Sequence, residues 1–225
     1  MKAMILAAGR GERLRPLTDR IPKPLVEVGG EPLIGHSLRR LAALGIREVV
    51  INAWHLADQL IARIGDGSAW GVEVVWSREE ILMETGGGVR LALPLLGDEP
   101  FLVVNGDLLW RLELEALLGA FARSRMDALL GLVANPPWGK GDFVREAATG
   151  RLSRAGGAPG SFTYSGIQIL NPEAVAPFAP VPFSLNLLYD QAIARGRLHG
   201  VPLVGSWFDI GTPERLAEAR ERYRP

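Results

Sequence analysis

A glycine-rich loop near the N-terminus carries residue types that suit the binding of a polyphosphate. Gly9 and Gly11 stand two positions apart, Arg13 follows, and Lys23 lies between two prolines. Glycines let the backbone approach anionic oxygens, and successive backbone N–H groups can form an anion-binding nest. A guanidinium grips phosphate oxygens with two hydrogen bonds, whereas an ammonium acts as a compact charge. The loop therefore indicates a phosphate site, although its charge alone would equally suit a solvated basic loop.

The loop matches neither of the two common nucleotide-binding fingerprints. The dinucleotide pattern G-x-G-x-x-G/A needs a small residue where Leu14 stands. A Walker A loop ends in Gly-Lys-Ser/Thr, and no such ending is present. An NAD-binding protein is therefore a weak alternative.

Two aspartates follow apolar, strand-like runs and suit a divalent cation. Asp107 ends the run at 101–107 (FLVVNGD), and Asp209 lies in a similar run at 206–212 (SWFDIGT). Mg²⁺ takes oxygen ligands, typically one or two carboxylates with substrate phosphates and water. Alternatively, Asp107 is a turn residue and Asp209 belongs to the cap of the last helix.

The elements that must position these residues alternate along the first part of the chain. Apolar runs predict strands at 1–8, 49–52, 72–76, 101–104 and 128–133, and helical spacing predicts helices at 32–44, 54–64, 89–96 and 112–122. This alternation predicts an α/β fold with a doubly wound, mostly parallel mixed sheet in three layers, α/β/α. Ligands of such sheets bind beyond the carboxyl ends of the strands. Those ends carry the loop after Ala8, Asn52, the glycines after Glu84, and Asp107.

After Pro136 the composition of the chain changes: residues up to position 160 are rich in Gly, Pro and Arg. A hairpin around 148–150, strands at 161–170, 198–204 and 207–208, and helices at 172–178 and 184–194 are expected there. Thr212, Pro213 and Glu214 predict the start of a last helix. No linker divides the chain, so we expect one domain over 1–225, its second half built onto the same sheet.

Composition excludes several classes of function. The formal net charge is zero, so nothing suggests bulk attraction to nucleic acid or an anionic membrane. The absence of cysteine excludes disulfides, Cys-ligated zinc and thiol nucleophiles. No apolar stretch is long enough to span a bilayer, and the N-terminal run favours a core strand over a signal peptide. A cytoplasmic protein is the expectation.

The full order of the N-terminal loop resembles the signature of the sugar-1-phosphate nucleotidyltransferases. Residues 6–18 read LAAGRGERLRPLT and residues 22–25 read PKPL. They match every position of that family's L-A-A-G-x-G-x-R-[LM]-x-P-L-T pattern and of the P-K-P that follows it. The resemblance implies a Rossmann-like nucleotidyltransferase fold, with Arg13 and Lys23 as catalytic residues. It implies that the nucleoside triphosphate is held by Ala8, Gly9, Gly11, Glu12, Arg13, Lys23, Glu84 and Gly87.

The resemblance also implies a metal and a second substrate. Asp107 and Asp209 match the family's two metal-binding segments, which implies Mg²⁺. The chain would then divide into a nucleotide-binding half at about 1–134 and a sugar-binding half at about 135–225. The implied sugar pocket consists of Asn105, Gly141, Asp142 and Gly166. Asp142 could instead cap a turn, and Trp138 could stack on the sugar or simply pack.

Some features depart from the larger relatives in the family. Their central Glu-Lys-Pro segment, whose lysine binds the sugar phosphate, has no counterpart near 151–159, which leaves Arg154 and Lys140 as candidates. We expect no hexapeptide-repeat domain to follow.

Within the family, this sequence most resembles the compact uridylyltransferases that act on N-acetylmuramate 1-phosphate. The ETGGG string at 84–88 and the short length carry this resemblance. The expected reaction is Mg²⁺-dependent transfer from UTP, or another nucleoside triphosphate, to a sugar 1-phosphate, with no nucleic acid or membrane partner. Three alternatives remain: guanylyl transfer to mannose (or a heptose) 1-phosphate, thymidylyl transfer to glucose 1-phosphate, and a non-catalytic regulatory module. A monomer or small homo-oligomer is expected.

Overall fold

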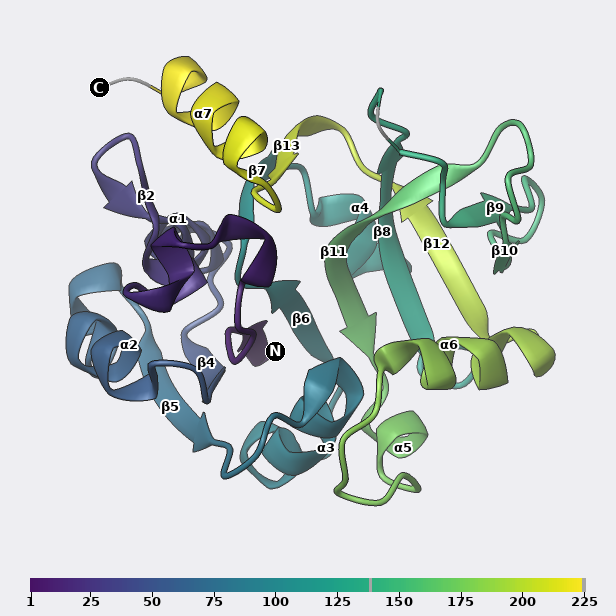
Figure 1. Ribbon diagram of the computed structural model, residues 1–225. Coiled ribbons are helices and arrows are strands. Elements are labelled where there is room, and N and C mark those ends of the chain that lie inside the picture. The colour runs from purple at the N-terminus through teal and green to yellow at the C-terminus, as the bar shows by residue number, and fades with distance from the viewer. Residues whose placement is uncertain (138, 224–225) are drawn as a thin grey trace.

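A mixed β-sheet forms the centre of the computed structural model, which describes residues 1–137 and 139–223 (Figure 1). Trp138 lies outside the described residues. The strands are β1 (Ala3–Leu6), β2 (Glu27–Val28), β3 (Glu31–Pro32), β4 (Glu48–Ala53), β5 (Glu73–Arg78), β6 (Phe101–Asn105), β7 (Leu108–Leu112), β8 (Ala128–Ala134), β9 (Phe143–Arg145), β10 (Leu152–Arg154), β11 (Phe162–Leu170), β12 (Leu198–Pro202) and β13 (Gly205–Asp209). The helices are α1 (Leu33–Ala43), α2 (Ala57–Ile64), α3 (Glu84–Leu96), α4 (Glu115–Ala120), α5 (Pro172–Val175), α6 (Leu185–Ala194) and α7 (Pro213–Arg222).

The main sheet is mostly parallel, as the sequence predicts. Its strands follow the order β12, β8, β11, β6, β1, β4, β5, and β9 and β10 extend it beside one end of β11. β1 pairs in parallel with β4 and β6, and β4 pairs in parallel with β5. β11 is antiparallel to both of its long neighbours, β6 and β8. The carboxyl ends of β1, β4 and β6 therefore meet at one edge of the sheet.

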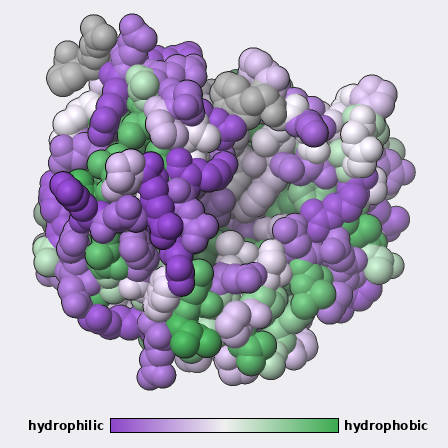
Figure 2. Space-filling model, viewed as in Figure 1, coloured by the Kyte–Doolittle hydropathy of each residue, from purple (hydrophilic) through white to green (hydrophobic). Residues whose placement is uncertain are grey.

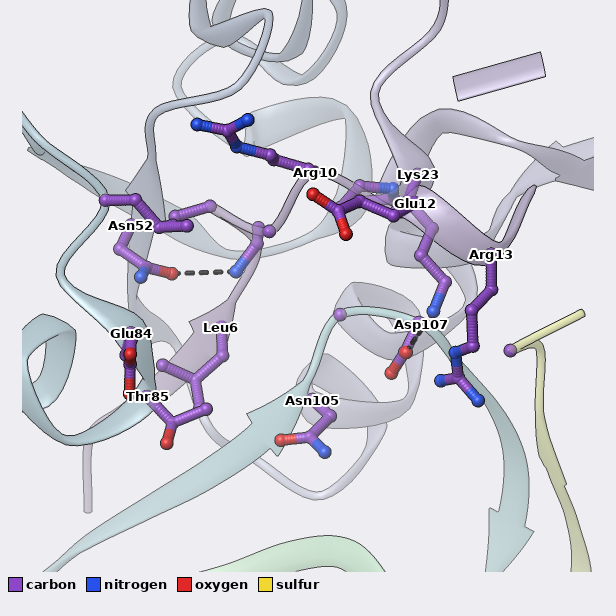
Figure 3. Close-up of a pocket in the computed structure, with 18 of the residues that line it drawn as sticks. Leu6, Arg10, Glu12, Arg13, Lys23, Asn52, Glu84, Thr85, Asn105 and Asp107 are labelled. Atoms are coloured by element: carbon purple, nitrogen blue, oxygen red, sulfur yellow. Dashed lines mark hydrogen bonds and ion pairs between the residues drawn. The ribbon is translucent and has the colours of Figure 1, made fainter. Parts of the chain in front are cut away.

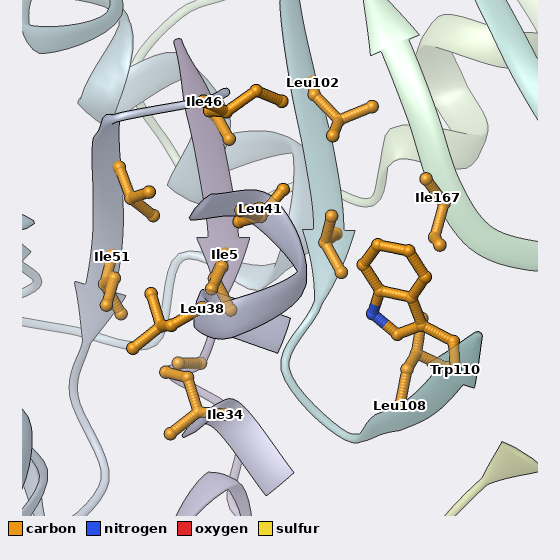
Figure 4. Close-up of a cluster of buried hydrophobic side chains, with 14 of the residues drawn as sticks. Ile5, Ile34, Leu38, Leu41, Ile46, Ile51, Leu102, Leu108, Trp110 and Ile167 are labelled. Carbon is orange, nitrogen blue, oxygen red and sulfur yellow. The ribbon is translucent and has the colours of Figure 1, made fainter. Parts of the chain in front are cut away.

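Helices cover both faces of the sheet and produce the expected three layers. In β1, Ala3 and Ile5 belong to one core, together with residues of α1, α2 and α4. Met4 belongs to a second core, together with residues of α3, α5 and α6. Because both faces are covered, central strands such as β1, β6 and β8 are largely apolar along their length, whereas the edge strand β5 carries exposed residues. Figure 4 shows the first core, in which Leu38 and Leu41 of α1 lie against the sheet.

The structure corrects the sequence prediction at residues 108–112. These residues form β7, whereas the sequence predicts no strand there and a helix that begins at 112. β7 pairs with β13 in a separate two-stranded ribbon, in which Asp209 is opposite Leu108. The strands that Asp107 and Asp209 follow or end therefore belong to two different sheets. Asp107 follows a strand of the main sheet, and Asp209 ends a strand of the ribbon.

A second correction concerns α3, which begins at Glu84 and not at 89. Its glycines lie inside the first turns because other parts of the chain approach them closely. A Cβ atom on Gly86 would stand 2.3 Å from the Phe183 ring, and one on Gly87 would stand 2.4 Å from the Val181 carbonyl oxygen. The other expected elements appear within a few residues of their predicted bounds, including the hairpin of β9 and β10 and the final helix with Thr212 as its N-cap. Among the described residues, no helix has the length and apolarity needed to cross a bilayer.

Candidate active site

Two adjoining cavities open where the strands β1, β4 and β6 end. The larger has a volume of about 780 Å³ and the smaller about 340 Å³, and both are lined by Arg13, Asn105 and Asp107. Figure 2 views the face that carries the opening, where mostly hydrophilic side chains surround a central hollow. A cleft with two compartments that meet at a carboxylate suits two anionic substrates that must react with each other.

The glycine loop forms one wall of the larger cavity (Figure 3). Of the residues that the sequence assigns to the nucleotide, this cavity is lined by Ala8, Gly9, Gly11, Glu12, Arg13, Lys23 and Glu84. Gly11 has a φ of 65°, and a Cβ atom there would stand 2.8 Å from the Thr18 side chain. The Thr18 hydroxyl donates to the Gly11 carbonyl oxygen at 2.8 Å, and His55 Nε2 lies 2.8 Å from the Thr18 carbonyl oxygen. The loop is therefore folded tightly by contacts within the protein.

Lys23 and Asp107 form an ion pair at the junction of the two cavities. Lys23 begins a short 3₁₀ turn (Lys23–Leu25) between Pro22 and Pro24, and the Leu25 N–H donates to the Pro22 carbonyl oxygen at 2.8 Å. The prolines restrict the backbone, so the base of the Lys23 side chain is held in place. The ammonium neutralises the nearby carboxylate and remains within reach of an incoming phosphate.

Asp209 lies close enough to Asp107 for the two charges to interact. Burial and the charge of Asp107 raise the pKa of Asp209, while Lys23, Arg215 and Arg13 act in the opposite direction. Arg215 Nη1 lies 2.8 Å from an Asp209 carboxylate oxygen. Two carboxylates that repel each other in a partly buried position fit a divalent cation, which would relieve the repulsion. Mg²⁺ is usually held by one or two carboxylates together with substrate phosphate oxygens and water, which would be the remaining ligands here.

A buried hydrogen-bond network supports the opposite wall of the larger cavity. Of its members, the sequence singles out only Asn52, at the carboxyl end of a predicted strand, and gives it no role. Asn52 accepts a hydrogen bond from the Ala7 N–H at 2.7 Å and donates to Glu79 at 2.7 Å. The other oxygen of Glu79 accepts from the Met83 N–H at 3.0 Å. Burial raises the pKa of Glu79, and its hydrogen bonds with Met83 and Asn52 oppose this. Asn52 is a polar residue near the end of an apolar strand, and this was the signal available in the sequence.

The network leads directly to Glu84, the first residue of α3. Glu84 has a φ of 58°, in the left-handed region that non-glycine residues seldom adopt, and such strain is concentrated at functional sites. Thr85 lines the cavity, and its hydroxyl accepts from the Leu185 N–H at 2.9 Å. Gly87 lines neither cavity; its N–H donates to the Phe183 carbonyl oxygen at 3.1 Å. Gly87 thus serves the close packing of α3, and its assignment to the nucleotide finds no support in this placement.

All four residues that the sequence assigns to the sugar line the smaller cavity: Asn105, Gly141, Asp142 and Gly166. Gly166 has a φ of 79°, and a Cβ atom there would stand 2.9 Å from the Asn105 amide nitrogen. Asp142 also accepts a hydrogen bond from the Tyr164 N–H of β11 at 2.8 Å, so its carboxylate ties the loop to the sheet and does not cap a local turn through this bond.

The two cations considered for the sugar phosphate have different surroundings. Arg154 lines neither cavity; its guanidinium hydrogen-bonds Asp190 at 2.8 Å and Asn186 at 3.0 Å. Lys140 lines the smaller cavity, as does Arg215, which the sequence analysis did not single out. Arg154 is therefore excluded as the phosphate contact in this arrangement.

Comparisons with known proteins find relatives that match nearly the whole chain. A nucleotidyl transferase family model matches residues 2–139. The chain is 44% identical over 98% of its length to N-acetylmuramate α-1-phosphate uridylyltransferase of Neisseria meningitidis, 97% of which is covered. It is 37% identical over 96% of its length to the enzyme of the same name from Caulobacter vibrioides, 97% of which is also covered.

Solved structures share the fold. The HddC protein of Yersinia pseudotuberculosis superposes with a TM-score of 0.84 at 22% identity, with 99% of each chain covered. UDP-glucose pyrophosphorylase of Acinetobacter baumannii gives 0.80 at 18% identity, with 99% of this chain and 92% of that chain covered. With a family model that covers more than half of the chain and relatives at this identity over nearly the whole length, the resemblance seen in the N-terminal loop is confirmed: the chain belongs to the nucleotidyl transferase family and is an enzyme of the sugar-1-phosphate nucleotidyltransferase type.

Proposed function

We propose that this enzyme transfers UMP from UTP to N-acetylmuramate 1-phosphate and releases pyrophosphate. The observation that carries the proposal is the pair of cavities that meet at Asp107, one beside the glycine loop and one beside Asn105 and Gly166. Support for this particular substrate pair comes from the two relatives of that name, which match 98% and 96% of this chain. The proposed setting is the recycling of cell-wall sugars in the cytoplasm.

In this reaction the protein positions two substrates and neutralises charge. A phosphate oxygen of the sugar 1-phosphate attacks the α-phosphorus of UTP and forms the new P–O bond. The bond from the α-phosphorus to the bridging oxygen breaks, and its electron pair leaves with pyrophosphate. The attacking phosphate is already an anion at neutral pH, so no protein base is needed. Two anions approach each other, and cations held in place must lower the cost of that approach.

Each cation of the site has a proposed task. Arg13 lines both cavities and would stabilise the departing pyrophosphate with paired hydrogen bonds. Lys23 would move from Asp107 to the reacting α-phosphate. Asp107 and Asp209 would hold Mg²⁺, which when bound neutralises charge on the phosphates.

The remaining roles follow the two cavities. The backbone at Ala8, Gly9 and Gly11, with Glu12, would hold the triphosphate. Glu84 and the neighbouring Thr85 would face the base. Asn105, Gly141, Asp142 and Gly166 would hold the sugar. We also propose that residues 1–225 act as one domain, because β11, β8 and β12 extend the sheet that β1, β4 and β6 begin.

A pyrophosphate-release assay with five nucleoside triphosphates and a panel of sugar 1-phosphates tests the proposal. The expected result is the highest kcat/KM with UTP and N-acetylmuramate 1-phosphate. A higher value with another pair would overturn the substrate assignment and leave nucleotidyl transfer intact. Absence of turnover with every pair, in the presence of Mg²⁺, would contradict catalysis itself.

Guanylyl transfer to mannose 1-phosphate is the second candidate. Mannose-1-phosphate guanyltransferase of Yarrowia lipolytica is 32% identical over 95% of this chain, but only 61% of that protein is covered. The lower identity of this relative favours the uridylyltransferase. The GTP and mannose 1-phosphate arm of the same assay separates the two.

A further inference from the structure

The smaller cavity contains one cation that the reaction as described leaves without a task. Its other two cations, Arg13 and Arg215, are accounted for, since Arg13 also lines the larger cavity and Arg215 pairs with Asp209 at 2.8 Å. The third is Lys140, an exposed residue on the loop between β8 and β9. In the part of the chain that the structure describes, its ammonium has neither an ion-pair nor a hydrogen-bond partner.

The backbone on both sides of Lys140 is packed closely against its own loop and against the residue that precedes β11. A Cβ atom on Gly139 would stand 2.8 Å from Pro136, and one on Gly141 would stand 2.1 Å from the Ser161 hydroxyl. Gly141 also has a φ of 76°, which glycine adopts without strain. The base of the Lys140 side chain is thus fixed at the wall of the cavity.

Hydrogen bonds hold the rest of this loop. Asn135 donates to Ser161 at 3.1 Å and accepts from Thr163 at 2.9 Å. Asp142 connects to β11 through its own N–H, which donates to the Phe162 carbonyl oxygen at 2.8 Å. Lys140 is therefore a flexible cation on a well-anchored base.

Lys140 enters the cavity from a different element than the groups at the reaction centre. Asp107 follows β6 and Asp209 ends β13, whereas Lys140 belongs to the loop that leads to β9. A sugar 1-phosphate whose phosphate lies at Asp107 and Asp209 would direct another part of its ring towards Lys140. A neutral ring offers nothing there that requires a cation.

We propose that Lys140 is a specificity residue that binds a carboxylate carried by the sugar ring, so that the enzyme selects acidic sugar 1-phosphates over neutral ones. This inference rests on the proposed function, because N-acetylmuramate differs from N-acetylglucosamine by an ether-linked lactic acid. An ammonium on a four-carbon stem suits a carboxylate on a flexible ether, whereas a rigid guanidinium would need a fixed orientation. The interaction is a charge-assisted hydrogen bond at the mouth of the cavity.

The experiment compares Lys140→Gln with the wild type on three substrates with UTP. They are N-acetylmuramate 1-phosphate, its methyl ester at the lactyl carboxylate, and N-acetylglucosamine 1-phosphate. We expect Lys140→Gln to lower kcat/KM for the acid by about tenfold or more. Values for the ester and for the neutral sugar should stay within about twofold, since neither presents a charge to Lys140. Lys140→Arg should restore part of the loss, and added salt should weaken the wild-type preference for the acid.

The outcomes separate this inference from the proposed function. An equal loss on all three substrates would assign Lys140 to the phosphate or to the loop, and no loss on the acid would also overturn the inference. If the wild type used only another sugar 1-phosphate, the proposed function would fail, and this inference with it. Lys2→Gln is the control for lysine removal, because Lys2 lies outside both cavities and pairs with Glu48 at 3.0 Å.

Discussion

Asp107 lies where the two cavities join, with the Lys23 ammonium against its carboxylate and Asp209 close by. Asp209 has its own cation, Arg215, at 2.8 Å. Each of the two carboxylates is therefore paired with a cationic side chain, Lys23 or Arg215. We infer that metal and phosphates exchange these pairings, releasing Lys23 to the phosphate and leaving the carboxylates to the metal.

Replacing Asp209 by Ala should abolish most of the metal-dependent turnover. A ligand to Mg²⁺ is lost, and Arg215 loses its carboxylate, so we expect kcat/KM to fall by about a hundredfold or more. Because Asp209 is destabilised in the folded protein by burial and by Asp107, the variant should keep or gain thermal stability. Steady-state kinetics and thermal unfolding measure both effects. Full activity of the variant would refute the metal site with two carboxylates.

Replacing Lys23 by Ala should reduce kcat by about a hundredfold to a thousandfold, as for loss of one fixed donor to a transition-state oxyanion. The matched control is Lys2→Ala, since the Lys2 ammonium donates to the Leu95 carbonyl oxygen and pairs with Glu48 on the surface. That control should keep its activity within about twofold. Equal losses in the two variants would exclude the role of Lys23 at the reacting phosphate.

At the scale of elements, the segment from Glu79 to Glu84 positions the base side of the larger cavity. The Glu79 carboxylate accepts hydrogen bonds from Asn52 on β4 and from the Met83 N–H. It therefore joins the end of β4 to the start of α3. We infer that this carboxylate sets where the first turn of α3 begins and holds Glu84 in its strained conformation.

Glu79→Gln should weaken nucleotide binding without touching the reacting phosphates. The amide offers one acceptor where the carboxylate offers two, so a buried donor loses its partner at a cost of about 1–3 kcal/mol in unfolding free energy. We expect KM for UTP to rise more than kcat falls. Denaturant unfolding and kinetics test this, with the neighbouring, exposed Glu80→Gln as the control. An effect on kcat alone would contradict a positioning role.

The pH dependence of stability offers a separate test of Glu79. Burial raises its pKa above the ordinary value of 4.5, so between these two values the native state binds more protons than the unfolded state. The wild type should therefore lose unfolding free energy as pH rises from 4.5 through the raised pKa. Glu79→Gln should lack this part of the slope. Denaturant titrations of both proteins at several pH values measure it, and parallel slopes would contradict the assignment.

At the scale of the whole molecule, both cavities draw on distant parts of the chain. The larger combines the N-terminal loop with Ser184 and Gly211, and the smaller combines Arg13 with Lys140 and Arg215. Substrate binding therefore connects segments that are far apart in sequence. Unfolding of either half should release the ligand.

UTP with Mg²⁺ should raise the melting temperature of the whole protein in one transition. At a free concentration about 100 times Kd, binding adds about 2.7 kcal/mol, which corresponds to a shift of roughly 5–10 °C for a chain of this size. Asp107→Asn should remove most of the part of the shift that depends on the metal, which a titration with chelator isolates. Scanning calorimetry measures the shift. A separate unshifted transition would contradict a single cooperative unit.

The sequence by itself determined the family and most of the fold. The order of residues in 6–25 determines a tight loop with cations at set positions, because glycine, proline and arginine each act locally. The continuous apolar strands and the spacing of apolar residues in the helices predicted the layered α/β/α arrangement, since burial on both faces requires those patterns. The start of the last helix also depends on local residues, and the structure confirms Thr212 as its N-cap.

Tertiary structure alone decided which distant residues meet. No sequence pattern predicted β7, because its partner strand, β13, lies about a hundred residues away along the chain. Only the pairing of these two strands brings Asp209 close to Asp107. The glycines of α3 resembled a binding loop, yet the approach of Val181 and Phe183 is what requires them. Arg154 and Lys140 were equivalent cations in sequence. In the fold, Arg154 forms an ion pair with Asp190, whereas Lys140 lines the smaller cavity. Such ion pairs depend on contacts between distant segments, which no local sequence pattern predicts.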